Sequence, residues 1–439
     1  MEGEMGEPEP RFLNHESLII GIFAVINVKH NHMRPFFSLA LLFLLSVGVT
    51  GFSCGEKNSP PDPPPVEEPD PVIPASLFAM GVDLSYVNQI EEHGGVYRDS
   101  GEAKDPFTIL KSLGANTVRV RLWHHPQWVR EVYGDPAKTL YSGYGDVVKT
   151  IRRAKDLKMA VLLDFHYSDF WADPGRQEPP RAWENITSLN VLKDSIYNYT
   201  FTVLRNLDNL GLMPEMVQIG NETNCGLMMT GTKSGFPALN ACNGQWQNLG
   251  VLINSAISAV RDASAPSAVK PEIALHVADP KNLEWWFSKA VTDGGISDFD
   301  IIGFSWYPLW HTTIPFGSLP ALVKKMKTTY EKKVMVLETA YPWSISGADN
   351  YNNQFGSQNP LTGFPFNQQG QLDFMLKLTQ EMISAGASGV FYWEPAWITS
   401  GMKDSWGTGS SWENAAFFDF QGNTLPVTRY LSWEYKMNP

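Results

Sequence analysis

The sequence is poor in positive charge. Its 439 residues include 34 Lys and Arg against 46 Asp and Glu, which gives a formal net charge of −12 at pH 7. A protein that binds nucleic acid or an anionic membrane surface needs a basic patch. The acidic balance therefore argues against both kinds of partner, and we expect no nucleic acid to bind. It also favours a neutral substrate over an anionic one.

Long apolar runs are scarce, which argues against a membrane-spanning protein. One run, residues 36–49, follows Met33 and Arg34 and is followed by Gly51-Phe-Ser-Cys54. The run is near the lower length limit of a spanning helix, so a retained anchor is disfavoured. A basic start, an apolar centre and a small-residue exit are instead typical of an export signal that begins at Met33.

The cysteine at the exit resembles the acylated cysteine of bacterial lipoproteins, although Gly51 stands where a branched apolar residue is usual. We interpret residues 1–54 as an N-terminal extension and export signal, with Cys54 as the lipidation candidate. Plain secretion and a retained anchor are the alternatives. The expectation is an exported protein, lipid-anchored at the bacterial cell surface or in the periplasm.

Only two other cysteines occur, Cys225 and Cys242, and both fall in one predicted loop. An exported protein would readily join them in a disulfide. A free, buried pair is the alternative, and the geometry of the two residues decides between them.

Internal repeats with a period of about 20–50 residues are absent, which excludes a solenoid. The proline-rich stretch Ser59–Pro71 lies within residues 55–75. Proline fixes φ and removes a backbone donor, so this density is typical of an extended, semi-rigid spacer. We interpret residues 55–75 as a linker that holds the following domain off a membrane, although a linker without that purpose would look the same.

Residues 76–439 are predicted to form one domain in which β-strands alternate with amphipathic helices. The eight expected strands are Phe78–Leu84, Thr117–Leu122, Ala160–Phe165, Met216–Gly220, Glu272–Val277, Ile301–Ser305, Val334–Leu337 and Gly389–Tyr392. Helix-like segments between them include Asp105–Leu113, Gly145–Leu157, Leu192–Leu210, Gln245–Ala263, Leu319–Tyr330 and Gln369–Ala385. This alternation predicts an α/β protein with a single closed (β/α)8, or TIM, barrel.

Polar and aromatic residues gather where these strands end, on the side where a parallel barrel carries its active site. Asn221-Glu222 follows the fourth strand and Glu338 follows the seventh. Two carboxylates that flank a sugar linkage can hydrolyse it, and retention requires them about 5–5.5 Å apart. The charge of one would raise the pKa of the other, as a general acid needs. Sequence spacing does not decide which glutamate is the acid.

Other strand-end residues have simpler interpretations. Asp83, Asp164 and Glu394 are expected to hold the hydrogen-bond network of the cleft. His124-His125 is followed by no third ligand at a useful spacing, so no metal centre is expected.

Six stretches resemble one family in particular, the endo-β-1,4-galactanases of glycoside hydrolase family 53, within the clan of (β/α)8 retaining glycosidases. They occur in the family's order from about residue 77 to the C-terminus: Gly81–Ser85, Val118–Trp123, Leu163–Pro174, Val217–Glu222, Val336–Pro342 and Gly389–Trp397. The resemblance implies endo-hydrolysis of β-1,4-galactan, a neutral side chain of pectin, with retention of configuration.

The resemblance also implies roles for individual residues. The acid/base falls on Glu222, the nucleophile on Glu338, and Asn221 would bind the 2-hydroxyl of the sugar being cleaved. Further substrate-binding candidates are Tyr307, Trp393, His166, Arg119 or Arg121 around the −1 site, and Asp169, Trp171 and Asp173 on the third loop. The two arginines share one face of a strand, so the choice between them stays open.

The resemblance implies no required cofactor. Some bacterial members bind a structural calcium in the loop after the seventh strand, through oxygen ligands and a histidine. Here that loop offers Asp349-Asn-Tyr-Asn352 and no histidine, which argues against calcium. The rival interpretations are a clan relative that cuts mannan, xylan or cellulose, and a surface glycan-binding protein that has lost catalysis. We expect a monomer.

Overall fold

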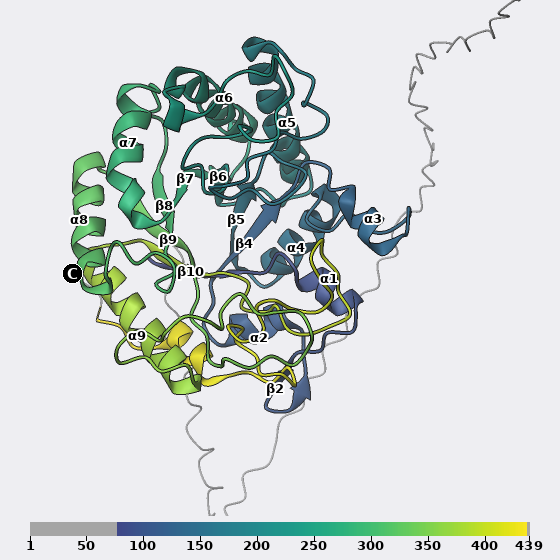
Figure 1. Cartoon of the computed structure of the whole chain (residues 1–439), viewed down its shortest axis with the longest axis vertical. Coiled ribbons are helices and arrows are strands. Elements are labelled where there is room, and N and C mark those ends of the chain that lie inside the picture. Colours follow the sequence, from purple (N-terminus) through teal and green to yellow (C-terminus); the bar gives the residue numbers. More distant parts are fainter. Residues whose placement is uncertain (1–76, 437–439) are drawn as a thin grey trace, which may run out of the picture. The chain divides into compact units, whose positions relative to one another are not determined.

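The computed structural model describes residues 77–436, and a closed parallel barrel forms their centre (Figure 1). Going round the barrel, the strands follow the order β1, β10, β9, β8, β7, β6, β5 and β4, and β4 pairs with β1 to close it. Their bounds are Ala79–Asp83 (β1), Thr117–Leu122 (β4), Ala160–Phe165 (β5), Met216–Ile219 (β6), Glu272–Ala278 (β7), Ile301–Ser305 (β8), Lys333–Thr339 (β9) and Gly389–Tyr392 (β10). The predicted (β/α)8 barrel is confirmed.

Helices surround the barrel and cover its outer face (Figure 1). Their bounds are Val87–Glu92 (α1), Pro106–Ser112 (α2), Trp128–Tyr133 (α3), Tyr144–Asp156 (α4), Leu189–Asn209 (α5), Trp246–Ser264 (α6), Leu283–Thr292 (α7), Leu319–Tyr330 (α8) and Gln368–Ala385 (α9). Short 3-10 turns lie at Ala241–Asn243, Pro280–Asn282, Phe316–Ser318 and Pro426–Ser432. Because the strands are covered on both faces, their sequences are nearly continuous apolar runs.

The barrel interior has an apolar layer beneath a polar one. The apolar layer consists of Ala79, Leu162, Met216, Ala274, Ile301, Met335, Leu337 and Phe391. Side chains alternate along a strand, so the next inward position after Leu162 is Asp164, and the next after Ala274 is His276. Both of these polar residues are fully buried. The alternation therefore places a layer of polar side chains above the apolar layer, nearer the carboxyl ends of the strands.

The predicted elements agree with the structure to within a few residues at each end. The helices α1, α3 and α7 and the small hairpin β2 (Arg98–Asp99) and β3 (Glu102–Ala103) were not among the expected elements. α1 and α3 have six residues each, too few to show a helical period. α7 begins Leu283-Glu-Trp-Trp-Phe, where consecutive apolar residues obscure the period.

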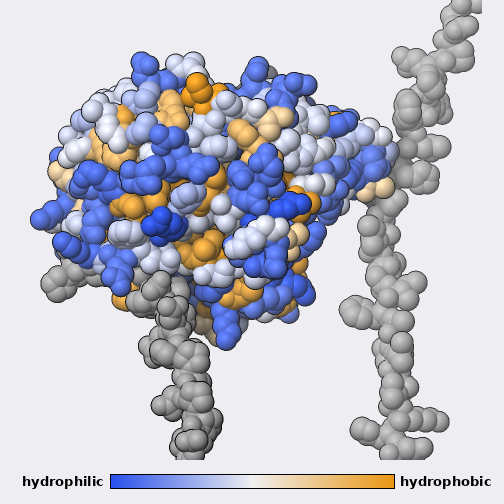
Figure 2. Space-filling model, turned by 90° about the horizontal axis from the view of Figure 1, so that it is seen from below, coloured by the Kyte–Doolittle hydropathy of each residue, from blue (hydrophilic) through white to orange (hydrophobic). Residues whose placement is uncertain are grey.

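None of the helices within residues 77–436 has the length and apolar character needed to cross a membrane. On the face drawn in Figure 2, hydrophobic side chains are interspersed among hydrophilic ones. The export signal predicted at 1–54, its Cys54 and the linker at 55–75 lie outside the described residues. The described chain enters the barrel at the amino end of β1, the face opposite the carboxyl ends of the strands.

Candidate active site

A cleft of about 500 Å³ opens at the carboxyl ends of the strands. It is lined by Asp83, Arg119, Arg121, His166, Trp171, Ala172, Asp173, Arg176, Asn221, Glu222, Tyr307, Trp310, Glu338, Tyr351, Asn352, Gln354, Trp393, Trp397, Asp404, Trp406, Ser411 and Trp412. Carboxylates and tryptophans predominate in this lining. Such a surface combines hydrogen-bonding groups with flat apolar faces on which sugar rings can stack.

A β-bulge aims Glu338 into the cleft. The pairing of β9 with β8 skips one residue of β9 at this point. Phe304 pairs with Val336, whereas the next residue of β8, Ser305, pairs with Glu338, and the pairing of β9 with β10 shifts in the same region. Leu337 belongs to the inner apolar layer. In a regular strand the next residue would point outward, toward the helices. The extra residue lets Glu338 face the interior as well.

Glu222 is placed by a turn with left-handed backbone. Gly220 has φ of 79° and Glu222 has φ of 48°, a region that costs energy for a residue other than glycine. The turn is held from two sides, because Gln177 Nε2 donates to the carbonyl of Asn221 at 2.8 Å and Thr223 N donates to the carbonyl of His276 at 2.9 Å. Strained backbone with this much support is common at catalytic positions.

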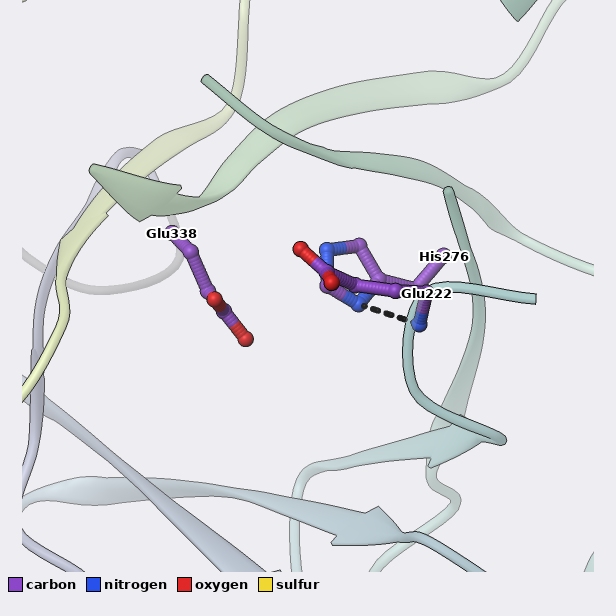
Figure 3. Close-up of side chains that lie close together, drawn as sticks. All are labelled: Glu222, His276 and Glu338. Carbon is purple, nitrogen blue, oxygen red and sulfur yellow. Dashed lines mark hydrogen bonds between the residues drawn. The ribbon is translucent and has the colours of Figure 1, made fainter. Parts of the chain in front are cut away.

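The two glutamates face each other across the cleft (Figure 3). A carboxylate oxygen of Glu222, one of Glu338 and a ring nitrogen of His276 all lie within 4.8 Å of one another. Retaining glycosidases hold their carboxyl groups about 5–5.5 Å apart, whereas inverting enzymes need about 6.5–9.5 Å to admit a water. The spacing in this cleft matches the retaining geometry.

The surroundings of Glu222 and Glu338 give the two carboxyl groups different pKa values. Burial, followed by the negative charge of Glu338, raises the pKa of Glu222 well above its usual value. Burial also raises the pKa of Glu338, but the Arg119 guanidinium and the Tyr307 hydroxyl act in the opposite direction. Arg119 Nη1 lies 2.8 Å from Glu338 Oε1, and the Tyr307 hydroxyl donates to Oε2 at 2.8 Å. Glu338 therefore ionises first, and Glu222 keeps its proton to a higher pH.

Arg119 is the arginine that contacts the nucleophile candidate. Its guanidinium also contacts Asp83 and Asp164, each at 2.8 Å, and it donates to Asn221 Oδ1 at 2.8 Å. A buried cation shared among three carboxylates holds them in fixed positions through charge-assisted hydrogen bonds. This geometry resolves the choice between the two arginines and gives Asp83 and Asp164 the network role expected of them.

Arg121 has a different partner. Its Nη1 lies 2.7 Å from Glu394, and its guanidinium carbon lies 4.0 Å from the ring centre of Tyr86 and 4.3 Å from that of Trp171. Burial raises the pKa of Glu394 to about 8, with Arg121 acting against the rise. Arg121 thus lines the cleft while packing the aromatic wall, and Glu394 has the supporting role expected for it.

His166 organises the loop after β5. Its Nε2 lies 3.0 Å from Asp164, and its Nδ1 accepts from Trp123 Nε1 at 3.2 Å and from Ala172 N at 3.3 Å. Asn221 Nδ2 donates to the carbonyl of the same Ala172 at 2.8 Å. The loop that carries Trp171 and Asp173 is therefore tied to the catalytic turn.

The remaining candidates divide into two groups. Asn221, Tyr307, Trp171, Asp173 and Trp393 all line the cleft, as expected for substrate-binding residues. Asp169 does not, within the part of the chain that the structure describes, so its predicted contact with substrate is not supported. Its carboxylate instead accepts from the backbone N–H groups of His125 and Arg181, at 2.8 and 2.9 Å. Those bonds fix the outer part of the loop.

His276 and Ser305 belong to the polar strand ends that the sequence predicts at the cleft. They lie beneath Glu222, at 3.0 Å from each other. Several residues that line the cleft were not predicted from the sequence. They come from long loops whose course no sequence pattern predicts: Arg176, Tyr351, Asn352, Gln354, Asp404, Trp406, Ser411 and Trp412.

The two loop cysteines meet. The structure joins Cys225 to Cys242 by a disulfide that closes the loop after β6, three positions beyond Glu222. Asn224 in the same loop exchanges two hydrogen bonds with the backbone of Ala278, at 2.7 and 2.9 Å. The segment that carries Glu222 is thus held by a covalent link on one side and by β7 on the other.

The loop after β9 is held by hydrogen bonds to the loop after β10. Asp349 accepts from the backbone N–H groups of Tyr351 and Ser410, at 2.7 and 2.8 Å. The Tyr351 hydroxyl donates to Asp404 at 2.8 Å. Each oxygen of Asp349, the acidic residue of the candidate calcium ligands, therefore accepts a hydrogen bond from a backbone N–H group.

Comparisons with known proteins also indicate a glycoside hydrolase. The family model of glycosyl hydrolase family 53 matches residues 79–431. The chain belongs to glycosyl hydrolase family 53. An arabinogalactan endo-beta-1,4-galactanase of Cellvibrio japonicus is 42% identical over 363 residues, which cover 82% of this chain and 92% of that protein. An endo-beta-1,4-galactanase of Bacillus subtilis is 33% identical over 393 residues, covering 81% and 86%.

Among solved structures, the family 53 catalytic domain of Ignisphaera aggregans matches with a TM-score of 0.73 at 34% identity. The match covers 85% of this chain and 100% of that domain. The predicted family is confirmed, and the family 53 barrel accounts for the whole of the described cleft.

Proposed function

We propose that the protein is an endo-β-1,4-galactanase that hydrolyses β-1,4-galactan with retention of configuration. The observation that carries this proposal is the pair Glu222 and Glu338, whose carboxylate oxygens approach within 4.8 Å in the cleft of a family 53 barrel, with Arg119 and Tyr307 in direct contact with Glu338. One carboxyl is thereby kept anionic for attack while the other keeps its proton for the leaving group.

In the first step Glu338 attacks the anomeric carbon of the sugar in the −1 site. Glu222 gives its proton to the glycosidic oxygen, the C–O bond breaks, and a covalent galactosyl ester forms on Glu338. Asn221 Nδ2 and Oδ1 are both engaged by protein groups, so its amide is held rigidly beside the sugar. We assign it to the 2-hydroxyl, and the walls of Trp171 and Trp393 to ring stacking.

In the second step Glu222, now ionised, takes a proton from water, and the oxygen of that water attacks the anomeric carbon of the bound sugar, whose bond to Glu338 breaks. Glu338 leaves as a carboxylate, and the sugar is released with the configuration it had in the polymer. Arg119 and the Tyr307 hydroxyl stabilise the carboxylate as it reappears. Apart from this water, both steps use only groups of the protein.

Products formed from galactan over time test substrate, endo action and retention together. Oligosaccharides of several lengths should appear early, and the first anomer formed should be β by NMR. Parallel assays on mannan, xylan and cellulose separate the proposal from the other glycanases of the clan. Activity confined to one of those polymers, or α-anomers at the outset, would reject it.

Variants of the two glutamates test the roles. Glu338→Ala should reduce hydrolysis by several powers of ten on every substrate, because the nucleophile is lost. Glu222→Ala should do so on galactan but much less on a dinitrophenyl galactobioside, whose leaving group needs no protonation. A wild-type rate for Glu338→Ala would reject Glu338 as the nucleophile, whereas a wild-type protein that binds galactan without hydrolysing it would be a glycan-binding protein.

The proposed reaction requires no cofactor, and we propose that calcium is not required for the fold either. Asp349 already accepts hydrogen bonds from Tyr351 and Ser410. Incubation with excess EDTA should leave both the rate on galactan and the melting temperature unchanged. A fall in either that added calcium restores would contradict this.

We further propose that Cys54 carries a lipid that tethers the exported enzyme to a bacterial membrane. The support is the sequence: a basic residue, an apolar run and a cysteine, followed by a proline-rich spacer. In a bacterial host that processes lipoproteins, the protein should sediment with membranes, and Cys54→Ser should release it to the soluble fraction. Equal partition of the two would reject the lipid.

A further inference from the structure

Ser305 lies directly behind the acid/base candidate. It ends β8, is fully buried and takes the register position beside Glu338. Its hydroxyl contacts His276 Nε2 at 3.0 Å and hydrogen bonds to the Glu222 carboxyl. We propose that Ser305, held by His276, is a positioning residue that fixes one oxygen of Glu222 and leaves the other to the substrate. This inference rests on the proposed role of Glu222 as acid/base.

The direction of the hydrogen bonds follows from His276. Burial, followed by the charge of Arg119, lowers the pKa of His276 well below its usual value, so the ring is neutral and carries one proton. Its Nδ1 faces two donors, Gln218 Nε2 at 3.0 Å and the backbone N–H of Glu222 at 3.3 Å. An atom that faces two donors accepts. The proton therefore resides on Nε2, which donates to Ser305.

Asn221 Oδ1 also lies 3.0 Å from His276 Nδ1, but it is already the acceptor for Arg119 Nη2 at 2.8 Å and Gln218 Nε2 at 3.2 Å. Asn221 Oδ1 thus accepts its hydrogen bonds from Arg119 and Gln218 and needs no donor from His276. Nδ1 of His276 is therefore the acceptor of the bonds from Gln218 and Glu222.

Ser305 then has its own proton to give. Since its oxygen accepts from His276, its single hydrogen is directed at Glu222. This donor favours the ionised carboxylate and so moderates the rise in the pKa of Glu222. The charged groups that face Glu222 are Glu338 and Asp173, which raise its pKa, and Arg119, which lowers it.

Two functions follow from this arrangement. The oxygen that accepts from Ser305 is turned toward the barrel, so the proton for the leaving group resides on the outer oxygen. Ser305 also keeps the acid from becoming too weak, because a carboxyl must release its proton in the first step and recover one in the second. His276 takes part only through Ser305 and the backbone of Glu222.

The test is the pH profile of kcat/KM on galactan for Ser305→Ala in the full chain. Loss of a donor to the carboxylate raises the pKa of Glu222, and the enzyme is active while that group is protonated. The alkaline limb should therefore move up by about one pH unit, with a lower kcat. Ser305→Thr keeps the hydroxyl and should keep the limb near that of the wild type.

Thr339→Val is the matched control. Thr339 follows Glu338 in the chain, and its buried hydroxyl has no hydrogen-bond partner among the described residues, so its removal should leave the limb in place. On the dinitrophenyl galactobioside, Ser305→Ala and wild type should share one alkaline limb, because that leaving group needs no proton.

A folded Ser305→Ala whose limb on galactan does not move would overturn the inference. If Ser305→Ala does not fold, Ser305→Cys decides in its place: the thiol is a weak donor, so the limb should move up part of the way, and an unmoved limb would again overturn it. Failure of the proposed function is distinguishable, because Glu222→Ala would then lose activity equally on galactan and on the activated substrate.

Discussion

At the scale of residues, Glu222 and Glu338 have the same side chain, and their neighbours in the cleft give them different roles. Glu338 receives a guanidinium and a phenol, at 2.8 Å each, whereas the charges that face Glu222 are mostly negative. Both are buried, so these contacts are only weakly screened by solvent. Removing one hydroxyl that donates to either carboxylate should therefore change the pH dependence of kcat/KM.

Tyr307→Phe removes that hydroxyl from Glu338. The pKa of Glu338 should rise, since a donor to its ionised form is lost, and the acidic limb of kcat/KM should move to higher pH. The nucleophile acts as an anion, so activity appears only as pH rises through this pKa. We expect kcat to fall by about one to two powers of ten, measured on galactan across pH.

Tyr197→Phe provides the control for this prediction. Its hydroxyl also donates to a carboxylate, Asp262, at 2.7 Å, but on the exposed surface of α5. Its acidic limb should match that of the wild type. A limb that moves equally in both variants, or in neither, would contradict the role assigned to Tyr307.

The sequence predicts some of these residues and not others, for a physical reason. Glu222, Asn221 and Glu338 follow apolar runs directly, so their place at strand ends could be predicted. Arg119 and Arg121 share one strand face, and only the positions of Asp83 on the neighbouring strand β1 and of Glu394 after β10 distinguish them. Asp169 stands in a matching motif but accepts from the backbone of His125, in the loop after β4, and of Arg181.

At the scale of elements, the site depends on two local departures from regular structure. The bulge in β9 turns Glu338 inward after Leu337, and the left-handed turn after β6 does the same for Glu222. Neither can be predicted from hydrophobic pattern, because the pattern only shows that an apolar run has ended. The strands themselves were predicted well, since a parallel strand buried on both faces is apolar throughout.

The disulfide in the loop after β6 should stabilise the fold more than it affects the chemistry. The two cysteines are 17 residues apart, and closing a loop of that size contributes about 3 kcal/mol. Replacing both by serine should lower the free energy of unfolding in urea by about that amount. The rate at 25 °C should change little, because Asn224 still ties the segment to Ala278.

The reduced wild-type protein offers an independent check, since it should unfold at the same urea concentration as the double-serine variant. Equal stability of the oxidised wild type and the variant would mean that the link does not constrain the unfolded chain. A large loss of kcat in the variant would instead make Cys225 part of the support of Glu222.

At the scale of the whole molecule, one closed barrel carries every group that the proposed reaction uses. The described residues 77–436 include all eight strands and the complete cleft. A protein that starts at Ser76 should therefore fold, elute as a monomer in size-exclusion chromatography and hydrolyse soluble galactan at the rate of the full chain. A lower melting temperature or rate would assign a structural role to the residues removed.

The amino end of β1 lies on the far side of the barrel from Glu222 and Glu338. The described chain therefore begins on the face of the barrel opposite the cleft. Coupling the enzyme to beads through an N-terminal tag should thus preserve its rate on long galactan chains, while coupling through a cysteine introduced at Asn352, at the cleft, should block them.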